Sequence, residues 1–347
     1  MTATAAFLSV YFCASVVQAE PLTEPDRIFA DNSTLEVTIS APFTSIMDVR
    51  SVDEETPGKL QYTNSEGVAV EFDVAIRSRG LYRRRADICR FAPIRLNFKK
   101  SQTRDTLFDK QDKVKIVTHC QPRSGTYEQT VITEYLAYRI LNLLTDMSFR
   151  VRLLRVTYKD TDRSGRETVN YAVLIEHRDR LANRIDATVF KTNKVRIGDL
   201  RPEHTNIASV FQYLIGNTDF SPVAGRPDDD CCHNYVLFDV GGEKLVSVPY
   251  DFDQSGLVNA PHASANPRFR LKSVKSRLYR GRCFNNVQLP ASLARFREKR
   301  EEIDALMREQ PSLASGTKKR VLAFVAAFYK TIDNPKRVEK RLVKKCI

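Results

Sequence analysis

Residues 211–259 read FQYLIGNTDFSPVAGRPDDDCCHNYVLFDVGGEKLVSVPYDFDQSGLVN, and this stretch decides which fold the sequence predicts. An apolar helix end is followed by Asp219 in a loop. Asn234 opens one expected strand, and a second strand ends in the acidic pair Asp251 and Asp253. Because a two-strand hairpin brings its outer ends to one edge, we expect these side chains to converge.

Converging Asp and Asn side chains suit the transfer of a phosphoryl group. This reaction needs divalent ions to hold the phosphate oxygens and a carboxylate to orient the attacking hydroxyl. Mg²⁺ is usually held by one or two carboxylates together with substrate phosphates. The order Asp219, Asn234, Asp251 is also the order of a kinase catalytic loop and its metal-binding Asp. The alternative is that these residues only cap helices and turns.

These motifs resemble the spore-coat CotH kinase family, a group of secreted, atypical protein-kinase-like proteins. The family has an N-x-D turn, a later H-N before a strand, and then P-x-D-x-D. Here the three motifs are matched by residues 217–219, 233–234 and 249–253. The chain departs from the family at Phe220, where the family has Trp, and in the long insert at residues 223–232.

The resemblance implies an ATP-dependent phosphotransferase. In this interpretation Asp219 is the catalytic base. The ligands of Mg²⁺ or Mn²⁺ are Asn234, Asp251 and Asp253. The departures at Phe220 and in the insert affect the expected substrate more than the expected fold.

Alternating apolar and polar residues dominate the first third of the chain. This period of two predicts an antiparallel sheet of about five strands. The expected strands are residues 35–43, 59–63, 68–76, 93–98 and 113–118.

An arginine-rich turn, RSRGLYRRR at residues 77–85, separates two of these strands. Guanidinium groups grip phosphate through paired hydrogen bonds, and Gly80 lets the backbone approach a phosphate closely. The resemblance implies that Arg79 and Gly80 face nucleotide phosphates and that Arg95 replaces the usual strand lysine. The alternative is a solvated surface that only attracts anions.

Residues 127–144 form the strongest expected helix, with an apolar stripe at helical spacing. The resemblance implies that Glu134 pairs with the phosphate-binding basic residue. The alternative places Glu134 on the wet face of an amphipathic helix. Two further strands, residues 150–159 and 168–176, end at Glu176, where the backbone is expected to meet the adenine ring.

The later part of the chain is mainly helical by periodicity. Strands with one helix come first and helices follow, so we expect an α+β, two-lobed protein-kinase-like fold with a cleft between the lobes. Residues 32–176 would form the N-lobe, built on an antiparallel sheet, and residues 177–347 the mainly helical C-lobe. The expected C-lobe helices are residues 206–216, 289–308, 316–332 and 334–344.

Residues 1–19 are predicted to be a signal peptide, because an apolar core is followed by Val-Gln-Ala before the expected cleavage site. Residues 20–31 then form a leader. The alternative is a buried N-terminal helix or a lipid-facing anchor, although the apolar run is shorter than the ~20 residues that span a bilayer. The sequence thus predicts an exported protein, periplasmic or extracellular, with no transmembrane segment after cleavage.

The cysteine content agrees with export. After removal of Cys13, an even number remains, which favours three disulfides in an exported chain. Cys89 and Cys120 lie at the ends of neighbouring expected strands, so we expect them to pair.

Cys231 and Cys232 would then pair separately with Cys283 and Cys346, in an order that the sequence leaves open. Zinc bound near His233 is the alternative, but adjacent cysteines are poorly placed to ligate one ion.

The formal net charge of +13 favours anionic partners. The first hypothesis is a phosphotransferase whose partners are a nucleotide and a hydroxyl of a protein or envelope glycan. The basic charge suggests that this protein or glycan is anionic. Nucleic acid is not expected as a partner. The second is a kinase-fold envelope protein that has lost catalysis and binds anionic polymer. The third is a metal-dependent hydrolase, since paired carboxylates with a metal also serve hydrolysis.

Overall fold

The computed structural model describes residues 24–225 and 230–347. The expected signal peptide, the first residues of the expected leader, and Asp228 and Asp229 of the insert lie outside these residues. Within the described ranges no helix is both long enough and apolar enough to cross a membrane.

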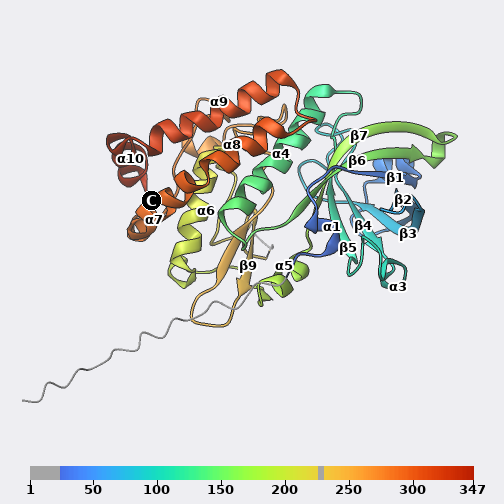
Figure 1. Ribbon diagram of the computed structural model, residues 1–347, viewed down its shortest axis with the longest axis horizontal. Helices are drawn as coiled ribbons and strands as arrows, with labels where there is room; N and C mark the ends of the chain where they lie inside the picture. Colours follow the sequence, from blue (N-terminus) through green and yellow to red (C-terminus); the bar gives the residue numbers. More distant parts are fainter. Residues whose placement is uncertain (1–23, 226–229) are drawn as a thin grey trace, which may run out of the picture.

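Seven strands close into one barrel, seen on the right of Figure 1. Every neighbouring pair is antiparallel except β1 and β6, which run parallel from Leu35 opposite Leu154 to Ala41 opposite Asp160. The order around the barrel is β1 (Leu35–Ala41), β2 (Thr56–Thr63), β3 (Ala69–Ser78), β4 (Ile94–Phe98), β5 (Lys113–Val117), β7 (Arg166–Ile175) and β6 (Val151–Asp160).

The prediction of a two-lobed protein-kinase-like fold with an antiparallel-sheet N-lobe is wrong. The finding that overturns it is the barrel itself, because β6 and β7 join the five earlier strands and the parallel pair β1 and β6 closes the sheet. Alternation along one strand specifies which side chains face inward, but it does not specify the neighbouring strand. The observed fold is α+β, with a closed mixed barrel accompanied by helices.

Alternate residues of the strands fill the barrel, as expected for a small closed barrel. Phe72 of β3, Phe98 of β4 and Phe108 of the following loop pack together, with ring centroids 5.3 to 5.7 Å apart. All three side chains are buried. The barrel interior is therefore a packed core.

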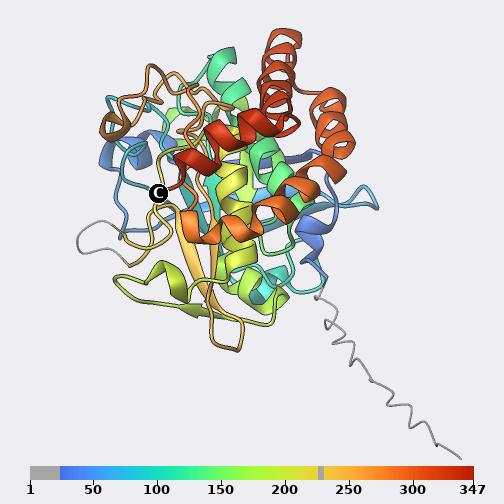
Figure 2. The same ribbon diagram turned by 90° about the vertical axis from the view of Figure 1, so that its left-hand side faces the viewer.

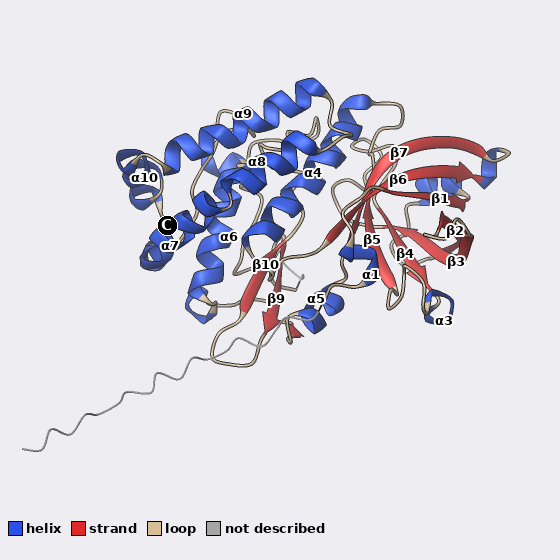
Figure 3. Ribbon diagram, in the orientation of Figure 1, coloured by secondary structure: helices blue, strands red, loops and turns tan. Residues whose placement is uncertain are grey.

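Helices occupy the other half of the molecule, drawn in blue in Figure 3. The long helix α4 (Gly125–Leu144) connects the two halves, because it contacts β6 and β7 on one side and α6 and α8 on the other. The α-helices that follow α5 are α6 (Pro202–Ile215), α7 (Leu289–Glu298), α8 (Arg300–Glu309), α9 (Ser315–Ile332) and α10 (Pro335–Arg341). Helices α7 to α9, in orange and red in Figure 2, pack against the two inner helices: α7 and α9 contact α6, and α8 contacts α4.

Most expected helices are confirmed within a few residues. The helix expected at residues 289–308 instead divides into α7 and α8 at Lys299. The sequence reading also missed several short helices, namely α1 (Arg27–Ala30), α2 (Phe43–Val49) and α3 (Lys100–Thr103). The short helix α5 (Arg178–Arg184) follows Glu176.

A second, three-stranded antiparallel sheet has the order β10, β9, β8. Its strands are β8 (Thr188–Phe190), β9 (Tyr235–Asp239) and β10 (Val246–Pro249). The hairpin expected after Asn234 is confirmed, and Tyr250 donates its backbone N–H to the Asn234 carbonyl over 3.0 Å. This hairpin therefore brings Asn234 next to the residues that follow β10.

Three cysteine pairs lie at disulfide distance. The predicted pair Cys89 and Cys120 is confirmed, and Cys120 also forms an antiparallel β-bridge with Phe91. Disulfides are consistent with an oxidising compartment.

The predicted pairing of Cys231 and Cys232 with the two C-terminal cysteines is wrong. Cys231 pairs with Cys232, and Cys283 pairs with Cys346. The C-terminal backbone lies beside Cys283, since Cys283 N–H donates to the Ile347 carbonyl over 3.2 Å. Cys346 is therefore already next to Cys283, a proximity that sequence order does not encode.

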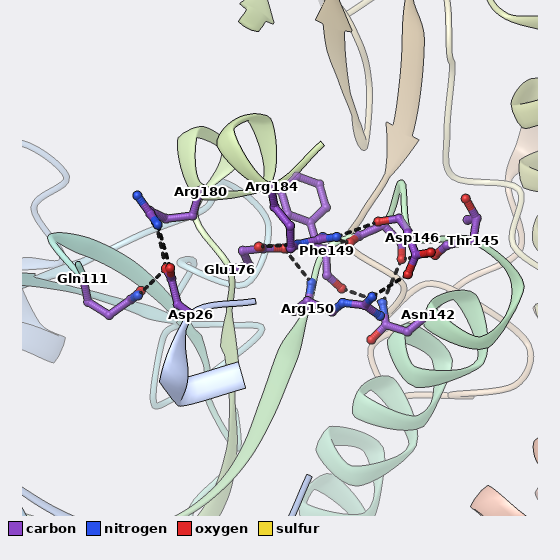
Figure 4. Close-up of polar contacts among 11 residues, drawn as sticks. Asp26, Gln111, Asn142, Thr145, Asp146, Phe149, Arg150, Glu176, Arg180 and Arg184 are labelled. Carbon is purple, nitrogen blue, oxygen red and sulfur yellow. Dashed lines mark hydrogen bonds and ion pairs between the residues drawn. The ribbon is translucent and has the colours of Figure 1, made fainter. Parts of the chain in front are cut away.

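A buried ion pair holds the junction between barrel and helices (Figure 4). Glu176, one residue after β7, accepts two hydrogen bonds of 3.0 Å from Arg184 of α5. Arg184 also donates to the carbonyls of Asp146 (2.9 Å) and Ser148 (2.7 Å), just after α4. Glu176 accepts the Arg150 backbone N–H, at the start of β6, over 2.9 Å. One pair thus joins four passes of the chain.

A second contact in the same view ties the start of the described chain to this junction (Figure 4). The Asp26 carboxylate accepts two hydrogen bonds from Arg180 of α5, over 2.6 and 2.8 Å. It also accepts one from the Gln111 side chain over 2.7 Å. Helix α1 is therefore held between the barrel and α5.

We expect Arg184→Leu to lower the free energy of unfolding by about 3–5 kcal/mol, because it leaves the Glu176 carboxylate buried without its charged partner. The double variant Glu176→Gln with Arg184→Met should recover part of this loss. The control is Arg155→Leu, whose ion pair with Glu36 is exposed and should be worth less than about 1 kcal/mol. Urea unfolding measures all four proteins, and equal losses in Arg184→Leu and Arg155→Leu would contradict the role of the junction.

The three cysteine pairs should differ in their effect on stability. Cys283 and Cys346 are 63 positions apart, so replacing both with Ser should cost about 2–4 kcal/mol under non-reducing conditions. Cys231 and Cys232 are adjacent and close no loop in the unfolded chain, so the same replacement should cost less than about 1 kcal/mol. Urea unfolding with equal losses for the two double variants would show that loop closure is not the source of the stabilisation.

Candidate functional site

A single cavity of about 630 Å³ gathers most of the predicted site residues. It lies where the barrel meets the loops after α6 and around the hairpin of β9 and β10. The predicted site residues that line it are Arg79, Gly80, Asp219, Asn234, Asp251 and Asp253. The convergence expected from the spacing of residues 211–259 is therefore observed.

The Asp219 side chain is fixed from two sides. Helix α6 ends at Gly216, which has a left-handed φ of 65°, and the Asp219 N–H then donates to the Asn217 side chain over 2.9 Å. His233 Nε2 lies 2.9 Å from Asp219 Oδ1, and Asn234 Nδ2 donates to the Asp219 carbonyl and to Oδ2, over 2.7 and 3.3 Å. The carboxylate nevertheless keeps 39% of its side-chain surface exposed. It is therefore oriented and still accessible from the cavity.

Asn234 and Asp251 both have left-handed backbone angles, with φ of 58° and 64°. Such angles are uncommon outside glycine and often occur at functional sites. The Asp251 N–H donates to the Tyr138 hydroxyl of α4 over 2.8 Å, which fixes the turn after β10. Burial raises the pKa of Asp251 to about 6, and the charge of Asp253 adds to this effect.

A chain of buried charges lies behind the cavity. Arg83 is 3.7 Å from Glu134 and 4.0 Å from Asp253, and His262 Nε2 is 3.0 Å from the Asp253 carboxylate. Burial opposes the ionisation of Asp253, but the hydrogen bond with His262 and the charge of Arg83 outweigh it, so its pKa is lowered. Asp253 is thus held by protein groups on the inner side of the cavity.

Glu134 is 2% exposed, which excludes the alternative that it lies on a wet helix face. Its charged neighbour is Arg83 of the arginine-rich turn, whereas the prediction paired it with a basic residue on a strand. Burial raises the pKa of Glu134 to about 8, and the charge of Asp253 contributes. Glu134 therefore supports the inner wall of the site and does not line the cavity.

Lys115 of β5 lines the cavity and was not predicted from the sequence. Its Nζ lies 4.9 Å from the centre of the Tyr250 ring. Burial lowers the pKa of Lys115 to about 7, and the charge of Arg79 lowers it further. An anionic ligand would raise the pKa of this amino group again, because a nearby negative charge favours its protonated form.

Arg95, the predicted substitute for the strand lysine, does not line the cavity. It lies on β4, directly opposite Arg77 of β3 and Lys115 of β5. Three cations thus form one row across three strands, and only the one on β5 belongs to the cavity. The alternation pattern alone did not distinguish between them, since all three occupy equivalent positions.

Glu176 is also separate from the cavity. Its side chain is bound by Arg184, and its backbone N–H donates to the Arg150 carbonyl over 2.9 Å. Three further residues of the site had no role in the prediction, namely Arg83, His233 and His262. His233 had a sequence signal, because it immediately precedes Asn234 in the H-N motif.

The acidic residues of the cavity do not form a compact metal cluster. Within the described part of the chain, the group of potential ligands whose donor atoms lie within 4.8 Å of one another is Cys89, Cys120 and His262. Both cysteines of that group are paired with each other, so it does not provide thiolates. An ion that is held by one or two protein groups and completed by phosphate oxygens does not need such a cluster.

No protein-family model matches the chain, and no curated protein matches it. The assignment of this site therefore depends on its own geometry and charges.

Proposed function

We propose that the protein is an ATP-dependent phosphotransferase that acts on a hydroxyl group of a protein or envelope glycan, with Mg²⁺ or Mn²⁺. The observation that carries the proposal is the charge arrangement of one cavity, with Lys115 and Arg79 from the barrel facing Asp219 and Asp251 from the loops. This proposal rests on the chemistry of the cavity and does not depend on a kinase fold.

The barrel side of the cavity supports phosphate binding. Lys115, with a pKa of about 7, becomes fully protonated when a phosphate approaches, because the negative charge raises its pKa. Arg79 adds a guanidinium that can hold phosphate oxygens in pairs. Gly80, with φ of 82°, keeps the turn free of a side chain beside them.

The loop side fits a hard divalent ion. Asn234 offers its amide oxygen, since its amide nitrogen donates to Asp219. Asp251 offers a carboxylate whose raised pKa reflects burial and the nearby charge of Asp253, and a bound cation would stabilise its ionised form. The ion would neutralise charge on the phosphate oxygens during transfer. Asp253 belongs to the same acidic group, with its orientation set by His262.

Asp219 is positioned to orient the acceptor hydroxyl and to accept its proton. His233 and Asn234 fix the two carboxylate oxygens from the side of the loop. Asp219 lines the cavity, where the acceptor would enter. In this scheme His233 is a positioning residue, because it acts through Asp219.

The compartment belongs to the same proposal. Three cysteine pairs at disulfide distance are consistent with an oxidising environment, and the N-terminal sequence favours export. We propose that the protein works in the periplasm or outside the cell.

Asp251→Asn and Asp219→Asn should both slow transfer strongly, but only the first should weaken metal-dependent nucleotide binding. Asp251 supplies charge to the ion, whereas Asp219 acts on the hydroxyl and its loss should slow transfer by about 10²–10⁴-fold. Calorimetry with Mn²⁺ and a nonhydrolysable ATP analogue measures binding, and transfer from labelled ATP measures rate. If Asp251→Asn bound metal and nucleotide as well as the parent, the assignment of the ion site would be wrong.

Lys115→Met should weaken nucleotide binding by about tenfold or more, since a charge-assisted hydrogen bond is worth roughly 1.5–3 kcal/mol. Arg95→Met is the matched control, because it removes a cation from the next strand that does not line the cavity. The same calorimetry compares the two variants. Equal affinities in both would remove Lys115 from the site, and an absence of nucleotide binding in the parent would favour a protein that only binds anionic polymer.

A further inference from the structure

The chain that follows Asp253 carries many basic side chains and no acidic ones up to Glu298. The Lys and Arg residues in this interval are Arg268, Arg270, Lys272, Lys275, Arg277, Arg280, Arg282, Arg295 and Arg297. We call residues 266–282 the basic segment.

The basic segment is anchored on the loop that carries Asp219. Arg280 donates to the carbonyls of Thr218 (3.1 Å) and Phe220 (2.7 Å), the two neighbours of Asp219 in sequence. Its guanidinium also lies 4.4 Å from the Phe220 ring centre. Asn266 Nδ2 donates to the same Thr218 carbonyl over 3.4 Å. The segment is thus fixed beside the proposed catalytic base, and it contributes Asn266 and Pro267 to the cavity lining.

Four cationic side chains of the basic segment are exposed and could contact a partner. Arg268, Arg270, Lys272 and Lys275 are exposed, and their side chains form no ion pair or hydrogen bond with other described residues. With no acidic residue in the interval, no sequence neighbour neutralises their charges. Unpaired charges of one sign beside a cleft attract ligands of the opposite sign.

We propose that these four cations bind an acidic peptide stretch of the acceptor, whose hydroxyl then reaches Asp219. This inference rests on the proposed function and specifies its substrate class. A nucleotide is held elsewhere in that scheme, because Arg79 and Lys115 come from the barrel, whereas the basic segment packs on the Asp219 loop.

A peptide fits the mouth of the cavity better than a polyhydroxylated chain does. Leu81, which lines the cavity, is 56% exposed, and Tyr82 beside it is 39% exposed. An exposed leucine suits the apolar side chains of a peptide. The expected acceptor is therefore a Ser, Thr or Tyr hydroxyl flanked by Asp and Glu residues and by at least one apolar residue.

The test measures binding before catalysis. A fluorescent peptide with Ser among Glu residues is titrated with the full chain, and anisotropy is recorded without nucleotide; a peptide with Gln in place of Glu serves as the neutral probe. The acidic peptide should bind more tightly, and added salt should weaken its binding because exposed charges are screened. Replacing Arg268, Arg270, Lys272 and Lys275 with Gln should lower its affinity by about tenfold, since several weak exposed pairs are lost together.

A matched control removes the same charge from the helical half. Lys319, Lys330, Lys336 and Lys340 are exposed and take part in no ion pair between described residues. Replacing these four with Gln should leave the affinity for the acidic peptide within about twofold of the parent, because none of them belongs to the basic segment or lines the cavity. If both quadruple variants lost affinity equally, binding would reflect only net charge and the proposal would be overturned.

Two further outcomes separate this proposal from the proposed function. If the acidic peptide binds at the basic segment while no nucleotide binds in calorimetry, the docking surface stands and the phosphotransferase assignment falls. If nucleotide binds but an acidic glycan such as polyuronate competes out the peptide and is itself the better acceptor, the peptide assignment is overturned. Nucleotide affinity should be the same in the parent and in the variant of the basic segment.

Discussion

The burial of one ion pair, Glu176 with Arg184, constrains how the two halves of the molecule meet. Both side chains are almost fully removed from water, so each charge depends on the other and on the carbonyls and N–H groups around it. These groups belong to the end of α4, the start of β6, the end of β7 and α5. The geometry of the seam between barrel and helices therefore follows from the requirement that no charge there is left unpaired.

The candidate site lies along that seam and takes its properties from it. Barrel strands supply cations and the loops of the helical half supply carboxylates, so neither half contains the site alone. Burial lowers the pKa of Lys115 to about 7 and raises the pKa of Asp251 to about 6, so both values lie close to neutral pH. A ligand that carries both a cation and phosphates would satisfy both walls at once, and this complementarity is the physical basis of the proposed chemistry.

The parts that the sequence predicted well are those set by local spacing. Asp219, Asn234 and Asp251 converge because a helix end and a tight hairpin fix their positions within about forty residues of chain. Lys115 was missed and the partner of Cys346 was predicted wrongly, since each depends on segments that meet only after folding. Barrel closure was not predicted for the same reason. The residues of β1 and β6 alternate as in other strands, and this pattern does not indicate that the two strands pair.

The parallel contact between β1 and β6 also bears on how the chain is made. Glu36 and Arg155 lie side by side across it, although they are 119 positions apart. During synthesis β1 to β5 emerge first, and the sheet then has two open edges until β6 and β7 follow. Contacts of such long sequence separation form slowly, and open edges pair readily with other chains. Incomplete chains that end before Val151 are therefore the species of this protein most prone to aggregate.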